Sequence, residues 1–372
     1  MLQQRPAPSA DRLEPLDGLR GLAVLAVLAC HTFPLAEGGF LGVDVFFVLS
    51  GYLITSLLLK EWSRNGRISF RAFYLRRVAR LAPAYVLMLA ITVPLMSGPL
   101  LSGSQANPDR WPAALAAGFS VIYAANWADA FHAAGMGPLE HTWSLSVEEQ
   151  FYVIWPAVLV LLNRRHRSLT RWLAVAIGLM TVGRVVWWAT THSLWPFFAT
   201  VTRGDGLLIG CLLAVLLRRG HLLPRTTARA AAWSQGCAWA AGAVLVTLML
   251  TSTIYSDSTY FFGLTATAAA TAVIVRHVVT RPGGALAGLL SWRPLAAVGR
   301  VSYGLYLFHL PLFMLVWTFG LPLVPALALQ YGLLGAVTVA SWFLLERPVQ
   351  RWARPRLTVP TVPVPAPSVP VH

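Results

Sequence analysis

Two titratable side chains, His31 and Asp44, lie in and just after the first apolar run of the sequence. Residues 16–33 read LDGLRGLAVLAVLACHTF, with Arg20 near one end and His31 near the other. A neutral imidazole can remove the proton of a hydroxyl group, which makes His31 a candidate general base. Asp44 follows thirteen residues later and could orient the imidazole or hold it basic. The alternative for His31 is a core histidine hydrogen-bonded between helices.

Two adjacent carboxylates, Glu148 and Glu149, lie in the segment HTWSLSVEEQFYVIWP at 141–156. Neighbouring side chains on a helix point about 100° apart, so these two cannot share one role. We expect Glu148 to face the other helices and Glu149 to cap the helix N-terminus, where negative charge is favourable. The alternative is that both carboxylates are caps.

Three further charges lie in apolar segments. Arg203 and Asp205 are two residues apart and do not face each other on a regular helix. Either Gly204 and Gly206 loosen this helix or each charge has a partner elsewhere, and Arg184 is a candidate partner for a carboxylate from another helix. Structural ion pairing and substrate binding both remain open for these charges.

Aromatic and basic side chains also occur at two other apolar segments. VSYGLYLFHLPLF places Tyr303 and Tyr306 on one side of a helix and His309 about 12 Å in from its cytoplasmic end. Arg77 and Arg80 lie three residues apart at the start of the apolar segment 78–98. They therefore share a helix face, which suits the binding of phosphates. Ordinary anchoring of a membrane helix at its basic end is the alternative for both arginines.

Composition indicates the elements that must position these groups. The chain has 372 residues, of which 56% are hydrophobic and 12% charged, with a mean hydropathy of +0.62. A soluble domain has about one quarter charged residues, so we expect an all-α, polytopic membrane bundle. Windows of about 20 apolar residues predict ten spans: 17–35, 39–59, 78–98, 147–163, 172–191, 195–217, 235–254, 259–279, 301–319 and 322–345.

The distribution of positive charge orients these spans. Of the 29 Lys and Arg residues, 26 fall in alternate connections, beginning with the N-terminus, so the positive-inside rule places both termini in the cytoplasm. The net charge of +15 is therefore spread over inner loops, which argues against a nucleic-acid face. An apolar stretch at 112–125 is too short to span and is predicted to be a re-entrant or surface helix on the outer side.

These boundaries predict three parts. Residues 1–16 form a cytoplasmic N-terminal segment, 17–346 the ten-helix membrane domain, and 347–372 a disordered, Pro-rich cytoplasmic tail. The three cysteines lie in apolar segments and predict no disulfide framework. Neither CxxC nor HExxH spacing occurs, so no metal site is expected.

Taken together, these stretches resemble the membrane-bound acyltransferase 3 family of bacteria over about residues 13–352. Arg20 and His31 match a basic residue and a histidine in the first span of the family, and Arg77 and Arg80 match its Arg-x-x-Arg. The other matching stretches are FFVLSGYLI (46–54), WSLSVEEQFYVIWP (143–156), RGDGLLIG (203–210), SYGLYLFH (302–309) and ERP (346–348).

The resemblance implies a multi-pass enzyme of the bacterial cytoplasmic membrane that transfers an acyl group, often acetyl, from acyl-CoA to a hydroxyl of a sugar-containing acceptor. In that picture His31 is the catalytic base or an acyl carrier, and we place Glu148 and Asp44 in the same catalytic group. The resemblance also implies that Arg77 and Arg80 hold coenzyme A phosphates and that Arg20 lines the same passage. No permanently bound cofactor is expected.

Several alternatives remain at this stage. The sequence resembles the minimal form of the family, without the hydrolase-like domain that some members carry, and this form includes enzymes that acylate polysaccharides and enzymes that acylate macrolide sugars. A membrane transporter is a different possibility, because charges within the membrane also mark translocation paths. No repeat relates residues 1–190 to 190–372, as it does in many transporters. An enzyme of lipid-linked glycans, such as a polysaccharide polymerase, is the third.

Overall fold

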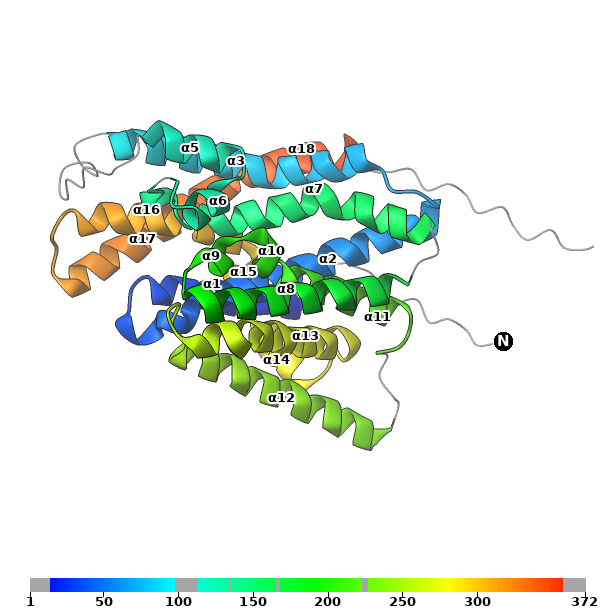
Figure 1. Cartoon of the computed structure of the whole chain (residues 1–372). Helices are drawn as coiled ribbons and strands as arrows, with labels where there is room; N and C mark the ends of the chain where they lie inside the picture. Colours follow the sequence, from blue (N-terminus) through cyan, green and yellow to red (C-terminus); the bar gives the residue numbers. More distant parts are fainter. Residues whose placement is uncertain (1–13, 98–112, 134, 165–167, 223–226, 357–372) are drawn as a thin grey trace, which may run out of the picture.

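The computed structural model describes residues 14–97, 113–133, 135–164, 168–222 and 227–356, and the secondary structure of these residues is helical throughout. Seven helical stretches in this part of the chain are long and apolar enough to cross a membrane, judged by length and composition. Their main helices are α2 (Gly42–Asn65), α3 (Phe70–Ser97), α7 (Thr142–Arg164), α8 (Leu169–Thr191), α12 (Ala228–Thr251), α13 (Leu264–Thr280) and α17 (Leu323–Ser341). The long helices lie roughly side by side, with α3 at the top of the view and α12 at the bottom (Figure 1). The protein is an all-helical, multi-pass membrane protein.

The other three predicted spans correspond to shorter helices. These are α1 (Glu14–Cys30), α16 (Ser302–Trp317) and the broken series α9 (Trp195–Phe198), α10 (Thr200–Arg203) and α11 (Asp205–Arg218). Most side chains of α16 and α11 are buried against other helices. A helix enclosed by protein does not have to match the thickness of the hydrocarbon core. The number of crossings therefore stays a prediction, with a helix present at each of the ten predicted positions.

Helices α2 and α11 make the closest contact near the centre of the bundle. A Cβ atom added to Gly51 would lie 1.9 Å from the Leu207 carbonyl oxygen, and one added to Gly210 would lie 2.1 Å from the Val48 carbonyl oxygen. Only glycine permits backbones to approach this closely, as is common between membrane helices. This contact fixes α11, and with it Arg203 and Asp205, against α2.

The connection before α16 folds back onto the start of α1. It contains α14 (Ala285–Leu290) and α15 (Arg293–Arg300). A Cβ atom on Gly18 would lie 1.7 Å from the Leu290 carbonyl oxygen, and one on Gly299 would lie 1.7 Å from the Asp17 carbonyl oxygen. These short helices therefore hold the first half of α1 in place.

Short helices also form the connection between α3 and α7. They are α5 (Ala113–Val121), α6 (Ala125–Ala130) and the 3-10 turn η2 (Gly137–Leu139). With nine residues, α5 is too short to span, as the sequence predicts for 112–125. The Tyr85 hydroxyl on α3 donates to the Ser120 carbonyl oxygen over 2.8 Å, which ties α5 to the bundle.

The C-terminal part differs from the sequence-based expectation. After α17 the chain continues through a π-helical turn, η4 (Trp342–Glu346), into α18 (Arg347–Arg356). The prediction of a disordered tail from 347 is wrong for 347–356, because α18 extends an existing helix and buries Ala353, while Arg347, Arg351 and Arg356 are exposed. Residues 357–372 lie outside the described part, as do residues 1–13 of the predicted N-terminal segment, whose last residues belong to α1.

Candidate active site

His31 directly follows the last residue of α1, after Cys30. Its Nδ1 atom lies 2.8 Å from the Val27 carbonyl oxygen, one helical turn back. A carbonyl oxygen only accepts hydrogen bonds, so Nδ1 carries the hydrogen and Nε2 of the neutral ring keeps a free lone pair. The next residue is also fixed, because the Thr32 hydroxyl lies 3.0 Å from the Tyr331 hydroxyl on α17. The free nitrogen of His31 is thus the one available as a base.

One imidazole packs against His31, and a further imidazole packs against that one. The ring centroids of His31 and His309 are 4.8 Å apart, and those of His309 and His141 are 5.3 Å apart. The three histidines come from α1, α16 and the residue before α7. His309 is one of the candidate residues predicted from the sequence. His141 is not, although it is the first residue of the segment 141–156. We call these three residues the histidine cluster.

Each of the two additional imidazoles has one bonded and one unbonded nitrogen. His309 Nδ1 lies 2.5 Å from the Tyr306 carbonyl oxygen, and His141 Nε2 lies 2.9 Å from the Leu307 carbonyl oxygen. Their other nitrogens, His309 Nε2 and His141 Nδ1, are buried without a hydrogen-bond partner among the described residues. A buried acceptor left in this way costs about 1–3 kcal/mol, so a donor is expected to bind here.

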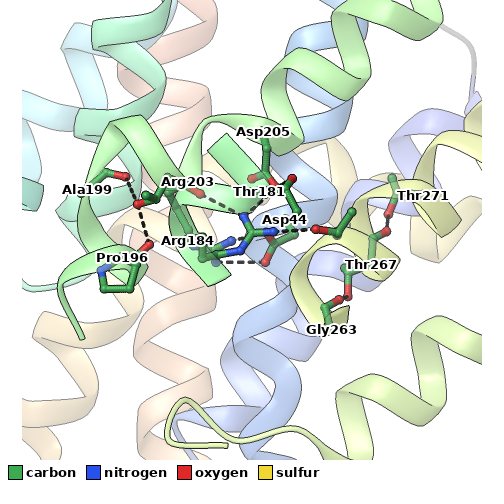
Figure 2. Close-up of polar contacts among 12 residues, drawn as sticks. Asp44, Thr181, Arg184, Pro196, Ala199, Arg203, Asp205, Gly263, Thr267 and Thr271 are labelled. Carbon is green, nitrogen blue, oxygen red and sulfur yellow. Dashed lines mark hydrogen bonds and ion pairs between the residues drawn. The ribbon is translucent and has the colours of Figure 1, made fainter. Parts of the chain in front are cut away.

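Asp44 does not contact the histidine cluster. Both of its oxygens accept hydrogen bonds from the Arg203 guanidinium, and both side chains are fully buried. The guanidinium is also surrounded by aromatic rings, with the Phe197 centroid 4.9 Å and the Trp143 centroid 5.5 Å from its carbon. Figure 2 shows this pair between α2 and the α10–α11 region. The expectation that Asp44 orients His31 is therefore wrong, because a stronger partner occupies the carboxylate.

A second ion pair lies beside the first (Figure 2). Arg184 donates to Asp205 Oδ2 over 2.6 Å and to the Thr202 carbonyl oxygen over 2.9 Å. It also donates to the Thr265 hydroxyl on α13 over 2.5 Å. The prediction that Arg184 pairs with a carboxylate from another helix is confirmed. The helix breaks at Gly204, between α10 and α11, so Arg203 and Asp205 have separate partners.

The two adjacent glutamates form different contacts. Glu148 accepts hydrogen bonds from Ser50 on α2 over 3.0 Å and from the Tyr152 hydroxyl over 3.1 Å. Glu149 forms an ion pair with Arg77 on α3 over 2.9 Å. The expectation that Glu149 caps a helix is wrong, because α7 begins at Thr142, well before this residue.

The tyrosines of α16 tie this helix to its neighbours. The Tyr306 hydroxyl lies 2.6 Å from the Ser144 hydroxyl and donates to the His141 carbonyl oxygen over 2.9 Å. The Tyr303 hydroxyl donates to the Leu81 carbonyl oxygen on α3 over 3.1 Å. Tyr306 therefore positions His141, a member of the histidine cluster.

Three arginines, two on α3 and one on α1, lie near one another. Arg20 Nε donates to the Ser302 hydroxyl over 3.3 Å, and Arg77 lies over the Tyr152 ring, 3.2 Å from its centroid. Arg80 is within electrostatic range of both other arginines, its side chain is exposed, and it makes no hydrogen bond or ion pair with the residues that the structure describes. We call Arg20, Arg77 and Arg80 the arginine cluster.

A buried carboxylate near the arginine cluster was not selected from the sequence. Glu346 ends the π-helical turn η4, is 3% exposed, and accepts a hydrogen bond from Ser341 over 3.0 Å. It lies within electrostatic range of Arg80. The ERP tripeptide at 346–348, one of the stretches that resemble the family, could have indicated this residue. In the structure it lies at a π-helical turn, a feature that is frequent at functional sites.

Comparison with known proteins identifies the family of the chain. A family model described as an acyltransferase domain matches residues 14–347, which include both clusters. The chain belongs to this acyltransferase family. No solved structure matches the chain.

Curated relatives of this acyltransferase cover most of the chain. YrhL of Bacillus subtilis is 34% identical over 352 residues, which are 90% of this chain and 54% of the relative. The peptidoglycan O-acetyltransferase OatA of Listeria monocytogenes is 33% identical over 360 residues, 90% of this chain and 55% of the relative. The O-acetyltransferase OatA of Staphylococcus aureus is 34% identical over 319 residues, 82% and 51% respectively. The chain thus spans about half the length of these relatives.

Two carboxyl groups, those of Asp129 and Glu140, lie in the described part of the connection between α3 and α7. Burial, together with the nearby Glu140 carboxylate, raises the pKa of Asp129 to about 8. Burial also raises the pKa of Glu140 above its ordinary range. Asp129 Oδ2 is buried without a hydrogen-bond partner in the described part of the chain. Protonation of these groups therefore makes the stability of the fold depend on pH.

Proposed function

We propose that the protein is a membrane O-acyltransferase that transfers an acetyl group from acetyl-CoA to a hydroxyl of a carbohydrate-containing acceptor. The observation that carries this proposal is the free Nε2 of His31, fixed by the bond of Nδ1 to Val27 within the matched acyltransferase domain. A base with one defined lone pair is what activation of a hydroxyl group requires.

In the proposed reaction His31 Nε2 takes the hydrogen of the acceptor hydroxyl as the oxygen attacks the thioester carbonyl carbon. The carbon–oxygen bond forms, the carbon–sulfur bond then breaks, and the proton passes from His31 to the departing sulfur. Coenzyme A leaves as a thiol and the acceptor as an ester. Proton transfer of this kind contributes about 10²–10⁴-fold to a rate.

The arginine cluster is the proposed binding site for the phosphates of the donor. Arg80 is best suited because it is exposed and makes no hydrogen bond or ion pair with the described residues, whereas Arg77 is already paired with Glu149. Arg20 and His31 are eleven residues apart on α1, about 16 Å along a helix. A donor with its phosphates at the arginines would therefore extend its pantetheine arm toward His31.

Ion pairing, rather than substrate binding, is the role we assign to Asp44, Arg203, Arg184 and Asp205, because their polar atoms are used by one another and by the backbone. Glu148 joins α2 to α7 beside the arginine cluster through Ser50. We place it in a supporting role for the donor site. Tyr303 has a comparable role between α16 and α3.

The proposed acceptor is a cell-wall type of glycan in the bacterial cytoplasmic membrane environment. All three relatives are named as O-acetyltransferases, two of them for peptidoglycan, and this supports a carbohydrate acceptor. The sequence alone left polysaccharides and macrolide sugars equally open. Chitopentaose, a soluble polymer of N-acetylglucosamine, is a suitable first probe of the acceptor site.

The decisive experiment measures transfer of radioactive acetyl from acetyl-CoA to chitopentaose by purified protein in detergent. We expect the wild-type protein to label the glycan and His31→Ala to lose at least about 10²-fold in rate, since the base is removed. Thermal unfolding should show that the variant is folded. His132→Ala, at an exposed histidine in the connection between α3 and α7, is the matched control and should keep full activity.

Full activity of folded His31→Ala would overturn the assignment of the base. An acyl-histidine route differs in one outcome, because wild-type protein would then retain label when acetyl-CoA is added without acceptor. Uptake of glycan or of coenzyme A into proteoliposomes without label transfer would instead indicate a transporter.

A further inference from the structure

The histidine cluster has no carboxylate to support a positive charge. When His31 takes a proton it becomes an imidazolium, and in many enzymes a carboxylate bonded to the other ring nitrogen stabilises that state. Here the other ring nitrogen faces the Val27 carbonyl oxygen. Among the described residues, no hydrogen bond or ion pair joins His31 or His309 to a carboxylate, lysine or arginine. The charge must be stabilised by neutral groups.

His31 contacts one buried imidazole, His309, which in turn contacts a second, His141, and each of the two has a free lone pair. His309 is fully buried and His141 is 4% exposed. Their bonds to the carbonyl oxygens of Tyr306 and Leu307 require hydrogens on His309 Nδ1 and His141 Nε2. Their remaining nitrogens can therefore only accept hydrogen bonds. Three acceptor nitrogens thus lie in one group of contacting rings, with no donor among them.

A single added proton would change this arrangement. Once His31 Nε2 carries a hydrogen, it becomes a donor, and His309 Nε2 is an unpaired acceptor on the ring in edge contact with it. One proton on His31 thereby supplies a donor for the unsatisfied acceptor of His309. His141 contacts His309 on the other side and keeps that ring in place.

We propose that His309 is a positioning residue that accepts a hydrogen bond from protonated His31 and so stabilises the charge formed during acyl transfer. This inference rests on the proposed function. No net proton passes to His309: the proton comes from the acceptor hydroxyl, stays on His31 while the thioester is attacked, and leaves on the coenzyme A sulfur. His309 therefore replaces the usual carboxylate, and does so from the Nε2 side of the ring.

The charged groups Glu148 and Arg203 are within electrostatic range of Tyr306, which contacts His309, and three uncharged titratable groups lie closer to the cluster. Cys30 Sγ lies 3.3 Å from His31 Nδ1, Tyr306 is on the same helix as His309, and Tyr331 on α17 contacts Thr32. All three are neutral near pH 7. A change in the pH profile after substitution of His309 therefore reports on the histidines themselves.

The test compares the pH dependence of kcat for acetyl transfer to chitopentaose between wild type and His309→Phe. Without the accepting nitrogen, His31 holds its proton less tightly, so the pH of half-maximal rate should fall by about 1–2 units, the effect of one hydrogen bond to a charged group. The plateau of kcat should fall about 10- to 100-fold. The KM for acetyl-CoA should stay the same, because its phosphates bind elsewhere.

Two further variants distinguish positioning from structural support. His309→Gln keeps an acceptor oxygen at the place of Nε2 and should recover part of the rate and of the pH profile. His277→Phe is the matched control: His277 is buried on α13, bonds Ser234 over 3.0 Å, and also has an unpaired Nε2, but lies outside the cluster. It should leave the half-maximal pH unchanged. Thermal unfolding shows which variants are folded.

A loss of folded protein lowers the rate equally at every pH and does not move its midpoint. A folded His309→Phe with the wild-type midpoint would overturn the inference while the role of His31 stands. If His31→Ala is itself active, the proposed function fails, and the profiles of the His309 variants then report on another base. If His309→Phe fails to fold, His309→Ala, which also lacks the accepting nitrogen but has a smaller side chain, decides, and an unchanged midpoint in folded His309→Ala overturns the proposal.

Discussion

At the scale of single residues, the local geometry of the candidate site follows from helix periodicity, whereas the pairing of charges does not. His31 bonds the carbonyl of Val27 four residues back and His309 that of Tyr306 three residues back, both within reach on one helix. The partner of Asp44, in contrast, is 159 residues away. No spacing rule along one helix could have found Arg203, so the sequence suggested His31 instead.

A substitution at Arg80 tests the donor site. We expect Arg80→Ala to raise the KM for acetyl-CoA about 10-fold or more with kcat unchanged, because one hydrogen-bonded charge pair with a phosphate is lost. Steady-state kinetics measure this. Arg71→Ala, an exposed arginine on the same helix, is the control. With acetyl-pantetheine, which lacks the nucleotide phosphates, wild type and Arg80→Ala should be equal, and a remaining difference would contradict a phosphate contact.

Asp129 should make stability depend on pH. Its pKa is raised from 3.8 in an exposed chain to about 8 in the fold. The folded state therefore binds the proton more tightly than the unfolded state, so its favourable effect is full below pH 4 and is lost as the pH rises to about 8. We expect Asp129→Asn, which stays neutral, to raise Tm relative to wild type at pH 8.5 but not at pH 4. Glu37→Gln, at an exposed position, should show a smaller difference.

At the scale of elements, the sequence predicted where helices lie better than how long they are. All ten apolar windows contain helix, yet α1, α11 and α16 have 17, 14 and 16 residues. A hydropathy window measures apolar content but not whether neighbouring helices cover it. The breaks at Ala199 and Gly204 depend on the polar partners of Arg203 and Asp205, which come from other helices. The sequence did not predict the helix at 347–356, because its charged and proline residues are typical of a polar tail.

The contact between α2 and α11 gives a prediction for glycine. Gly51→Ala places a Cβ atom 1.9 Å from the Leu207 carbonyl oxygen, so the two backbones must separate. We expect the folded state to lose about 1–3 kcal/mol or more, measured as a lower Tm in detergent. Gly178→Ala on α8 has open space around it and is the matched control, with an unchanged or higher Tm. Equal Tm values for the two variants would contradict this account.

At the scale of the whole molecule, ten crossings with both termini inside remain the prediction that charge distribution favours. Of these, seven are supported by the length and apolar composition of described helical stretches. The decisive segments are α9–α11 and α16, whose ends must lie on opposite faces if they cross.

Cysteine labelling of intact cells with an impermeant reagent tests these segments. We expect label at Thr191→Cys, before α9, and at Phe319→Cys, after α16, because both lie on the outer side in the ten-span arrangement. His221→Cys, after α11, should react only in opened membranes. The parent chain, with its three native cysteines, gives the background. Label at both Thr191→Cys and His221→Cys in intact cells would show that α9–α11 does not cross.

The long separation between Asp44 and Arg203 also matters before the protein is complete. Ribosomes add about 5–20 residues per second, so the carboxylate of α2 exists for about 8–30 s before its guanidinium has been synthesised. During that time an unpaired acidic group and the glycine face of α2 have no partner in the nascent chain. We therefore expect biogenesis to depend on retention of α2 beside the insertion machinery, and chains that end before Arg203 to be substrates for membrane proteases.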